Sequence, residues 1–146
     1  MSATNAFEMG ILNLIFPNSN YAAIGDATGL RGSTTAGVFY ISLHTADPGE
    51  TGTQTTSEAT YTSYARVSVA RSGAGFTVSG NSVSNAAAVT FPAATGGTNT
   101  ITHFGIGTDT SGAGNLLFSG ALTASLAVSS GITPAFAIGA LTTTAD

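Results

Sequence analysis

The sequence is poor in chemically reactive and charged side chains. Its 146 residues include no cysteine, no tryptophan and no lysine, and only three arginines and two histidines. Without cysteine there can be no disulfide framework and no thiolate zinc site, so stability has to come from burial and backbone hydrogen bonding. Seven acidic residues outnumber the arginines, which leaves no basic surface for phosphate contacts and argues against nucleic-acid binding.

Long apolar segments are also missing. No run approaches the roughly 18 residues that a membrane-spanning helix requires. The first apolar stretch is not preceded by a basic segment, so we expect no signal peptide. We therefore expect neither a membrane nor nucleic acid among the partners of this chain.

Small hydroxyl residues and glycine fill much of the chain. There are 24 threonines, 16 serines and 19 glycines, which is a composition typical of strands and tight turns. The mean hydropathy is positive although the net charge is only −4. A surface with few charges costs little to desolvate against another chain, so the composition favours a structural or binding module that assembles with other subunits.

The N-terminal segment predicts one short helix over residues 5–16. Asn5 and Glu8 have the spacing of a capping box, and Pro17 follows the last helical residue. One apolar stripe follows the helical period and comprises Phe7, Ile11, Leu14 and Ile15. A helix of about three turns is not stable alone in water. We expect it to pack on the β domain of its own chain, with packing on a neighbouring subunit as the alternative.

Residues 18–37 predict a long loop, or an extended arm that reaches a neighbouring subunit. From residue 38 the apolar period becomes two, because Phe39, Ile41 and Leu43 alternate with more polar residues. The sequence therefore predicts three parts: an N-terminal helix over 1–17, an extended loop or arm over 18–37, and a β-sandwich domain over 38–146.

Several further short runs are separated by turn residues. They lie at 64–69, 76–78, 82–84, 88–91, 101–106, 116–122, 124–128 and 132–141. Short strands at this spacing without a second helical pattern indicate a mainly β fold, namely an antiparallel β-sandwich or jelly roll with a short N-terminal helix.

No constellation of residues predicts catalysis. His44 or His103 could act as the base of a serine triad, but no nucleophile elbow of the G-x-S-x-G type is present. Glu50 and Glu58 lie in a threonine-rich loop without aromatic residues to hold a sugar, and Asp47 with Glu50 offers too few ligands for a metal. We expect no catalytic, cofactor-binding or metal-binding residues, no cofactor, and a chain that is not an enzyme.

Several motifs resemble small virion proteins of tailed bacteriophages. They are residues 38–52 (VFYISLHTADPGETG), 64–67 (YARV), 83–96 (VSNAAAVTFPAATG), 101–106 (ITHFGI) and 114–122 (GNLLFSGAL). The resemblance covers about residues 36–141 and extends to the N-terminal helix. Members are described as head-decoration, tail-fibre-like or structural proteins, so the resemblance implies a component of the virion.

The resemblance and the composition together lead us to expect a capsid decoration, or cement, protein. Its partners would be the major capsid protein and copies of itself in a homodimer or homotrimer, with no small-molecule substrate. The chain would be made in the host bacterial cytoplasm and would lie on the capsid surface. The alternative is a neck, tail adaptor or tail-fibre-associated protein in the tail or neck. A further alternative is a receptor- or glycan-binding module in which exposed Tyr61 and Tyr64 stack on sugars.

Aromatic, apolar and arginine side chains outside the clearest strand cores are the expected interface residues. These candidates are Phe7, Ile11, Phe16, Tyr21, Arg31, Tyr61, Tyr64 and Arg66.

Overall fold

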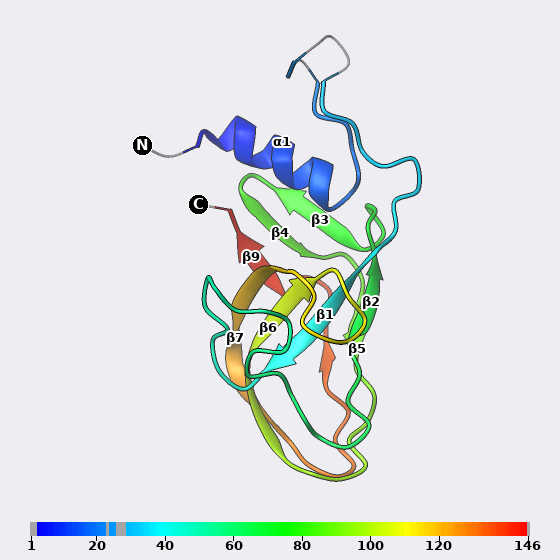
Figure 1. Ribbon diagram of the computed structural model, residues 1–146, viewed down its shortest axis with the longest axis vertical. Coiled ribbons are helices and arrows are strands. Elements are labelled where there is room, and N and C mark those ends of the chain that lie inside the picture. Colours follow the sequence, from blue (N-terminus) through cyan, green and yellow to red (C-terminus); the bar gives the residue numbers. More distant parts are fainter. Residues whose placement is uncertain (1–2, 23, 26–28, 146) are drawn as a thin grey trace. The chain divides into compact units, whose positions relative to one another are not determined.

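The computed structural model describes residues 3–22, 24–25 and 29–145 (Figure 1). The fold is mainly β, with several antiparallel sheets and one short N-terminal helix, which is consistent with the predicted β-sandwich class. Within these described ranges, no helix is long and apolar enough to cross a membrane.

Helix α1 spans Asn5–Ile15, so it starts at the predicted residue and ends one residue earlier than predicted. Thr4 is the N-cap, and its hydroxyl accepts a hydrogen bond from the backbone N–H of Phe7 at 3.4 Å. The predicted capping box was wrong because the cap lies at Thr4, which places Glu8 at the fourth helical position, where the reciprocal bond is not formed. Glu8 is buried, and one of its carboxylate oxygens has no hydrogen-bond partner among the residues that the structure describes.

The buried face of α1 differs from the predicted apolar stripe. Glu8, Leu12 and the C-cap residue Phe16 are buried, at a spacing of four residues. Helix α1 contacts strands β3 (Phe76–Ser79) and β4 (Ser82–Asn85), and Figure 1 shows it running alongside β3. The ring of Phe16 meets that of Phe76 edge to face, with centroids 4.9 Å apart. The expectation that the helix packs on its own chain is therefore confirmed.

The largest sheet has the strand order β2-β1-β6-β7. Its members are β1 (Val38–His44), β2 (Val67–Ala70), β6 (Asn99–Gly107) and β7 (Leu116–Val128). Strands β1 and β6 pair antiparallel, with Ile41 opposite Ile106 and Leu43 opposite Phe104, and all four of these side chains are buried. The predicted period of two places Phe39, Ile41 and Leu43 in the core, as observed.

The second face of β1 is buried as well, which the alternation did not predict. Ser42 and His44 are fully buried although they point away from Ile41 and Leu43. The loop that follows β1 covers them, since the backbone of Thr56 bonds to His44 and the backbone of Ser57 bonds to Thr45. A polar strand face can therefore be interior when a loop supplies its hydrogen-bond partners.

Other strand boundaries also depart from the predictions. The runs at 116–122 and 124–128 belong to one strand, β7, whose register against β6 shifts between Ile101 and His103. The run at 132–141 is not one strand. It contains only β8 (Ala135–Phe136), and β9 (Thr142–Thr144) follows it. Pro134 lacks a backbone donor and Gly139 has a positive φ of 74°, so neither position suits a continuous strand.

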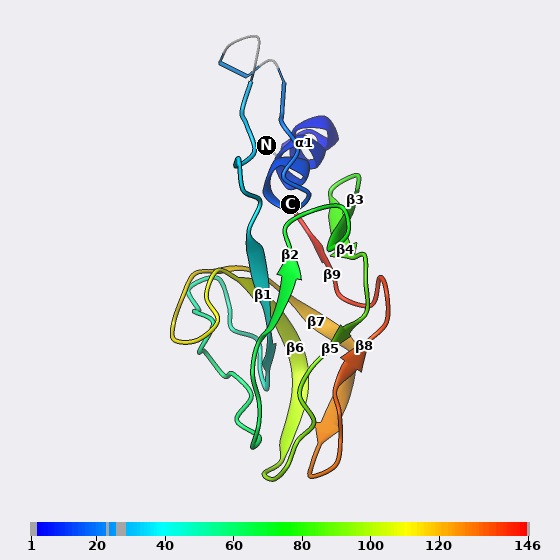
Figure 2. The same ribbon diagram turned by 90° about the vertical axis from the view of Figure 1, so that its right-hand side faces the viewer.

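Smaller sheets complete the fold. Strand β5 (Val89–Thr90) pairs antiparallel with β8, and Figure 2 shows these two strands side by side. Strands β3, β4 and β9 form a three-stranded sheet in that order.

The chain divides into two compact units, and both are built from segments that are far apart in the sequence. One comprises residues 1–38, 70–87 and 138–146, and the other comprises residues 39–69 and 88–137. Each unit has buried apolar residues of its own, such as Leu12, Phe16 and Phe76 in the first and Ile41 and Phe104 in the second. The predicted divisions at 17/18 and 37/38 stay predictions.

Candidate functional site

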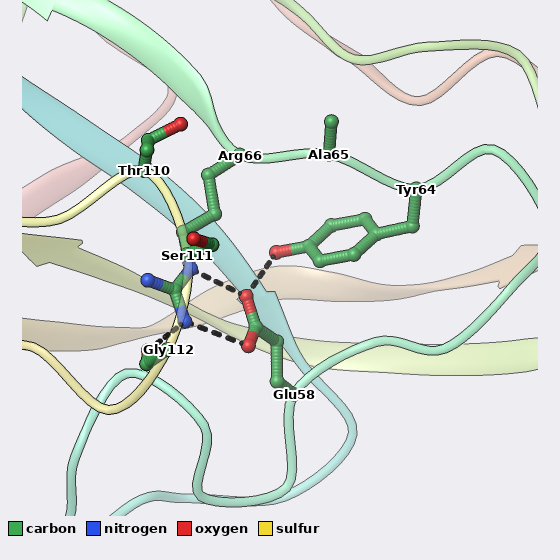
Figure 3. A pocket seen from close by; sticks show the side chains of 7 residues that line it. All are labelled: Glu58, Tyr64, Ala65, Arg66, Thr110, Ser111 and Gly112. Carbon is green, nitrogen blue, oxygen red and sulfur yellow. Dashed lines mark hydrogen bonds and ion pairs between the residues drawn. The ribbon is translucent and has the colours of Figure 1, made fainter.

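The most highly connected polar site is a buried ion pair between Glu58 and Arg66 (Figure 3). The Nε atom of Arg66 donates to Oε1 of Glu58 at 2.6 Å, and a terminal nitrogen donates to Oε2 at 2.8 Å. Two parallel bonds of this kind match the planar guanidinium to the carboxylate. The side chain of Arg66 is 2% exposed and that of Glu58 is 15% exposed. The hydrogen bonds with Glu58 are the main cause of a raised Arg66 pKa.

Arg66 also binds the loop between β6 and β7. Its terminal nitrogens donate to the carbonyl oxygens of Asp109 at 2.8 Å and Gly112 at 2.7 Å. The fully buried Gln54 supports the same loop, because its side-chain oxygen accepts from the backbone N–H of Asp109 at 3.0 Å. Residues 108–115 are thus attached to the segment 54–66 by charged and amide side chains.

Tyr64 completes the ion pair from the other side. Its hydroxyl donates to Oε1 of Glu58 at 2.9 Å and accepts from the backbone N–H of Leu43 at 3.0 Å. Its ring lies nearly parallel to that of Phe91, with centroids 6.3 Å apart, and meets Tyr61 edge to face at 5.3 Å. Burial raises the pKa of Tyr64 far above its ordinary value, so this phenol stays protonated and donates its hydrogen bond.

A pocket of about 290 Å³ lies beside this cluster. Its lining consists of Glu58, Tyr64, Ala65, Arg66, Thr110, Ser111 and Gly112. Figure 3 shows the carboxylate and the guanidinium meeting between Tyr64 on one side and residues 110–112 on the other. The pocket therefore combines a neutralised ion pair with the hydroxyl side chains of an exposed loop.

A serine and a histidine also meet in the core, but without the exposure that catalysis requires. The Nδ1–H of His44 donates to the carbonyl of Thr56, and its Nε2 accepts from the hydroxyl of Ser42, both at 2.8 Å. Both side chains have no exposed surface. Burial is the main cause of a lowered His44 pKa, which keeps this imidazole neutral. The pair is a satisfied structural element of β1, because no substrate could reach the hydroxyl.

A separate cluster, the α1–loop cluster, forms where residues 18–21 and 30–33 lie beside α1. Tyr21 and Leu30 exchange two backbone hydrogen bonds of 2.8 Å, and Tyr21 packs 6.2 Å from Phe7, centroid to centroid. The side chain of Asn18 bonds to the backbone of Ser33 in both directions. At least these parts of the predicted arm are thus held against their own helix.

Arg71 fastens this loop to the helix. It donates to the backbone carbonyls of Leu14 at 2.6 Å and of Ile15, which lie at the negative end of the helix dipole. It also donates to the hydroxyl of Ser33 at 2.9 Å and to the carbonyl of Ala36. No sequence pattern pointed to Arg71. The only signal available was that arginine is rare in this chain and is therefore used where several acceptors converge.

The predicted interface residues fall into two groups. Phe7 and Tyr21 lie at the α1–loop cluster, Ile11 is half-buried on α1, and Arg31 is exposed next to Leu30. Phe7 is 46% exposed, and Met9 and Leu30 are also exposed apolar residues. The other predicted residues, Phe16, Tyr61, Tyr64 and Arg66, are buried or half-buried by contacts within the chain. Contact of any of these residues with another protein stays a prediction.

The suggested sugar-stacking surface of Tyr61 and Tyr64 was wrong. Tyr61 is only 2% exposed, and its hydroxyl donates to the carbonyl of Pro92. Tyr64 is half-buried, and its ring packs against Tyr61 and Phe91, so the two rings do not form an exposed platform. Among the described residues, no group of three or more histidine, aspartate and glutamate side chains could hold a metal ion.

Comparison with known proteins gives one family. A family model described as podophage GP4 fiber I protein gp80 matches residues 2–144. No curated protein matches the chain.

Proposed function

The chain belongs to the podophage GP4 fiber I protein gp80 family, and from this membership we propose that it is a fibre-associated subunit of the phage tail or neck. The family establishes the coarser role, which is that of a structural component of a bacteriophage virion. The observation that carries the finer proposal is the description of this family as a fibre protein, together with a match over nearly the whole chain. Decoration of the capsid lattice is the alternative.

The geometry supports a structural role without catalysis. Arg66, Glu58, Tyr64 and Gln54 make charge-assisted or amide hydrogen bonds that hold neighbouring loops in one arrangement. The buried serine and histidine bond to each other and to the backbone. Networks that are satisfied in this way stabilise one conformation and leave no activated nucleophile or base.

We further propose that contacts with other virion subunits form at the α1–loop cluster. Phe7 and Leu30 expose apolar surface there, and Arg31 adds a charge. Aromatic residues and arginine are enriched at the centres of interfaces. The partners would be further copies of this chain and a neighbouring tail protein, or the major capsid protein if the chain decorates the lattice.

The test is the copy number of this chain in purified virions. Quantitative mass spectrometry would compare it with the major capsid protein, with a portal-ring protein measured in the same sample as the internal standard. Fibre or neck subunits follow the rotational symmetry of the tail, so we expect a small integer multiple of the ring stoichiometry. A ratio to the major capsid protein near one, or near another simple large fraction, would instead establish lattice decoration.

A further inference from the structure

Two of the three arginines are bonded within the chain, and the third is not. Arg66 binds Glu58, and Arg71 binds carbonyl oxygens at the end of α1. Arg31 is exposed, and its guanidinium has no hydrogen-bond or ion-pair partner among the residues that the structure describes. In a chain with so few charges, this free guanidinium is the cation that remains for contact with another molecule.

Arg31 directly follows the exposed apolar part of the α1–loop cluster. Phe7 is 46% exposed and Leu30 is 38% exposed. Tyr21 connects them, because its ring contacts that of Phe7 and its backbone pairs antiparallel with Leu30. Residues opposed in an antiparallel pair place their side chains on the same side. An arginine next to aromatic and aliphatic surface is typical of an interface centre, and its charge calls for an acidic partner.

An acidic turn of the same chain, residues 47–50, offers the complementary charge. Asp47 and Glu50 are both exposed. The Oδ1 atom of Asp47 accepts from the backbone N–H of Gly49 at 2.9 Å, and the carbonyl of Gly49 accepts from the N–H of Gly52 at 3.2 Å. These bonds hold the turn in one conformation without the Glu50 carboxylate, which has no partner within the described part of the chain.

A second copy of the chain is the occupant that these two surfaces favour. Each copy carries both a free cation beside apolar surface and a free carboxylate on a fixed turn, so each copy supplies what the next one needs. The two surfaces are different, so a contact between them is heterologous, and repetition of it gives a closed ring or a filament.

We propose that the α1–loop cluster of one copy binds the turn 47–50 of a second copy, with Arg31 of the first paired to Glu50 of the second. Phe7 and Leu30 lose exposed surface at this contact. The inference rests on the proposed role of the α1–loop cluster in subunit contact. Its test uses the isolated chain, so it fails or succeeds independently of the copy number in the virion.

The first experiment follows the amide NMR spectrum of the isotope-labelled chain at pH 7 as its concentration rises from about 20 µM to about 1 mM, since a small contact is expected to be weak. We expect concentration-dependent shifts at Phe7, Leu30 and Arg31 and also at residues 47–50. Shifts at the α1–loop cluster alone would mean that two like clusters meet, and this result overturns the heterologous contact. A spectrum that does not change with concentration also overturns it.

Charge reversal tests the pairing of Arg31 with Glu50. Arg31→Glu and Glu50→Arg each place like charges opposite one another, so each variant alone should associate at least about tenfold more weakly than the wild type in sedimentation analysis. An equimolar mixture of the two variants should recover association, because every contact between them joins opposite charges. The double variant Arg31→Glu/Glu50→Arg should recover it as well. If neither the mixture nor the double variant associates, while the amide spectra show intact folds, the two residues do not pair.

Net charge is controlled in the same series. Glu50→Gln and Thr123→Arg each make the net charge one unit less negative, but only the first removes the carboxylate of the turn, and Thr123 is exposed on β7. We expect Glu50→Gln to weaken association by about threefold and Thr123→Arg not to weaken it, because reduced repulsion favours contact between copies. Equal effects of both changes would show that the Glu50 carboxylate makes no specific contact.

Discussion

At the scale of single residues, two of the three arginines, Arg66 and Arg71, lie where several backbone segments meet. Arg66 joins Glu58 to two carbonyls of the loop 108–115, and Arg71 joins the end of α1 to the loop that follows it. Removing an arginine side chain from water costs desolvation free energy. This cost is offset only when nearly all of its N–H donors make hydrogen bonds. Both arginines meet that condition.

Removal of Arg66 should be strongly destabilising. Arg66→Ala leaves the largely buried Glu58 carboxylate without its counter-charge, and we expect the free energy of unfolding to fall by about 3 kcal/mol. The lower end of the usual range applies because the Glu58 side chain keeps 15% exposure. Urea denaturation measures the effect.

Arg31→Ala is the matched control, because Arg31 is exposed. This change should alter stability by less than about 0.5 kcal/mol. Equal stability of the two variants would show that the ion pair contributes nothing to the fold.

The buried His44 should make the free energy of unfolding depend on pH. Its pKa is lowered in the folded state from 6.5, mainly by burial. The unfolded chain therefore binds a proton more readily than the folded chain, so stability is complete above pH 6.5 and falls as the pH drops from there toward the lowered folded value. Chemical denaturation at a series of pH values measures this slope.

His44→Gln should remove that slope, because glutamine can bond to Thr56 and Ser42 but does not titrate in this range. His103→Gln is the control and should retain the slope, since the loss of stability is assigned to the fully buried His44. If the slope survives in His44→Gln and disappears in His103→Gln, His103 and not His44 causes the pH dependence of stability.

At the scale of elements, α1 is held from two sides. Its buried face packs on β3 and β4, and Tyr21 of the following loop lies against the backbone of Gly10. A Cβ atom at Gly10 would lie only 2.4 Å from the Cζ atom of Tyr21. The helix therefore tolerates a glycine, with its unfavourable helical propensity, because an aromatic ring occupies the space of a side chain.

A double-mutant cycle tests this arrangement. Alanine in place of glycine in a helix is ordinarily stabilising by about 1 kcal/mol. We expect Gly10→Ala to lose this gain in the wild-type background because the new methyl group displaces Tyr21, and to recover it in a Tyr21→Ala background. Urea denaturation of the four proteins gives the coupling energy. Equal effects of Gly10→Ala in both backgrounds would show that Tyr21 does not pack on Gly10.

At the scale of the whole molecule, low charge is the dominant property. The net charge at pH 7 is only −4, so little electrostatic repulsion opposes contact between copies. Such a surface suits a protein that functions in an assembly, which agrees with its membership of a virion structural family.

Self-association should rise as the pH approaches the isoelectric point of about 4.7, because the remaining repulsion vanishes there. Static light scattering should show a falling second virial coefficient between pH 7 and that value. Arg31→Glu makes the net charge two units more negative. The pH at which the second virial coefficient is lowest should therefore fall. If the second virial coefficient of both proteins is lowest at the same pH, and circular dichroism shows both proteins folded, the loss of net charge does not cause the self-association.

The sequence by itself determined the class of fold and the kind of protein. The period of two in residues 38–44, the glycine-rich turns and the short N-terminal helix are local patterns, and each backbone segment follows its own side-chain periodicity. The scarcity of charged and reactive residues, with the phage-like motifs, was sufficient to indicate a virion structural protein, and the family match confirms that level of description.

Only the tertiary structure decided how the polar residues are used. Glu58 and Arg66 are eight positions apart, while the acceptors at Asp109 and Gly112 are more than 40 positions further on, so no local pattern could bring them together. The same holds for Tyr61 and Tyr64, which were expected at the surface but are covered by distant segments such as the one that contains Phe91. Burial of a polar side chain depends on partners supplied by the rest of the chain, and those partners are known only when the fold places them.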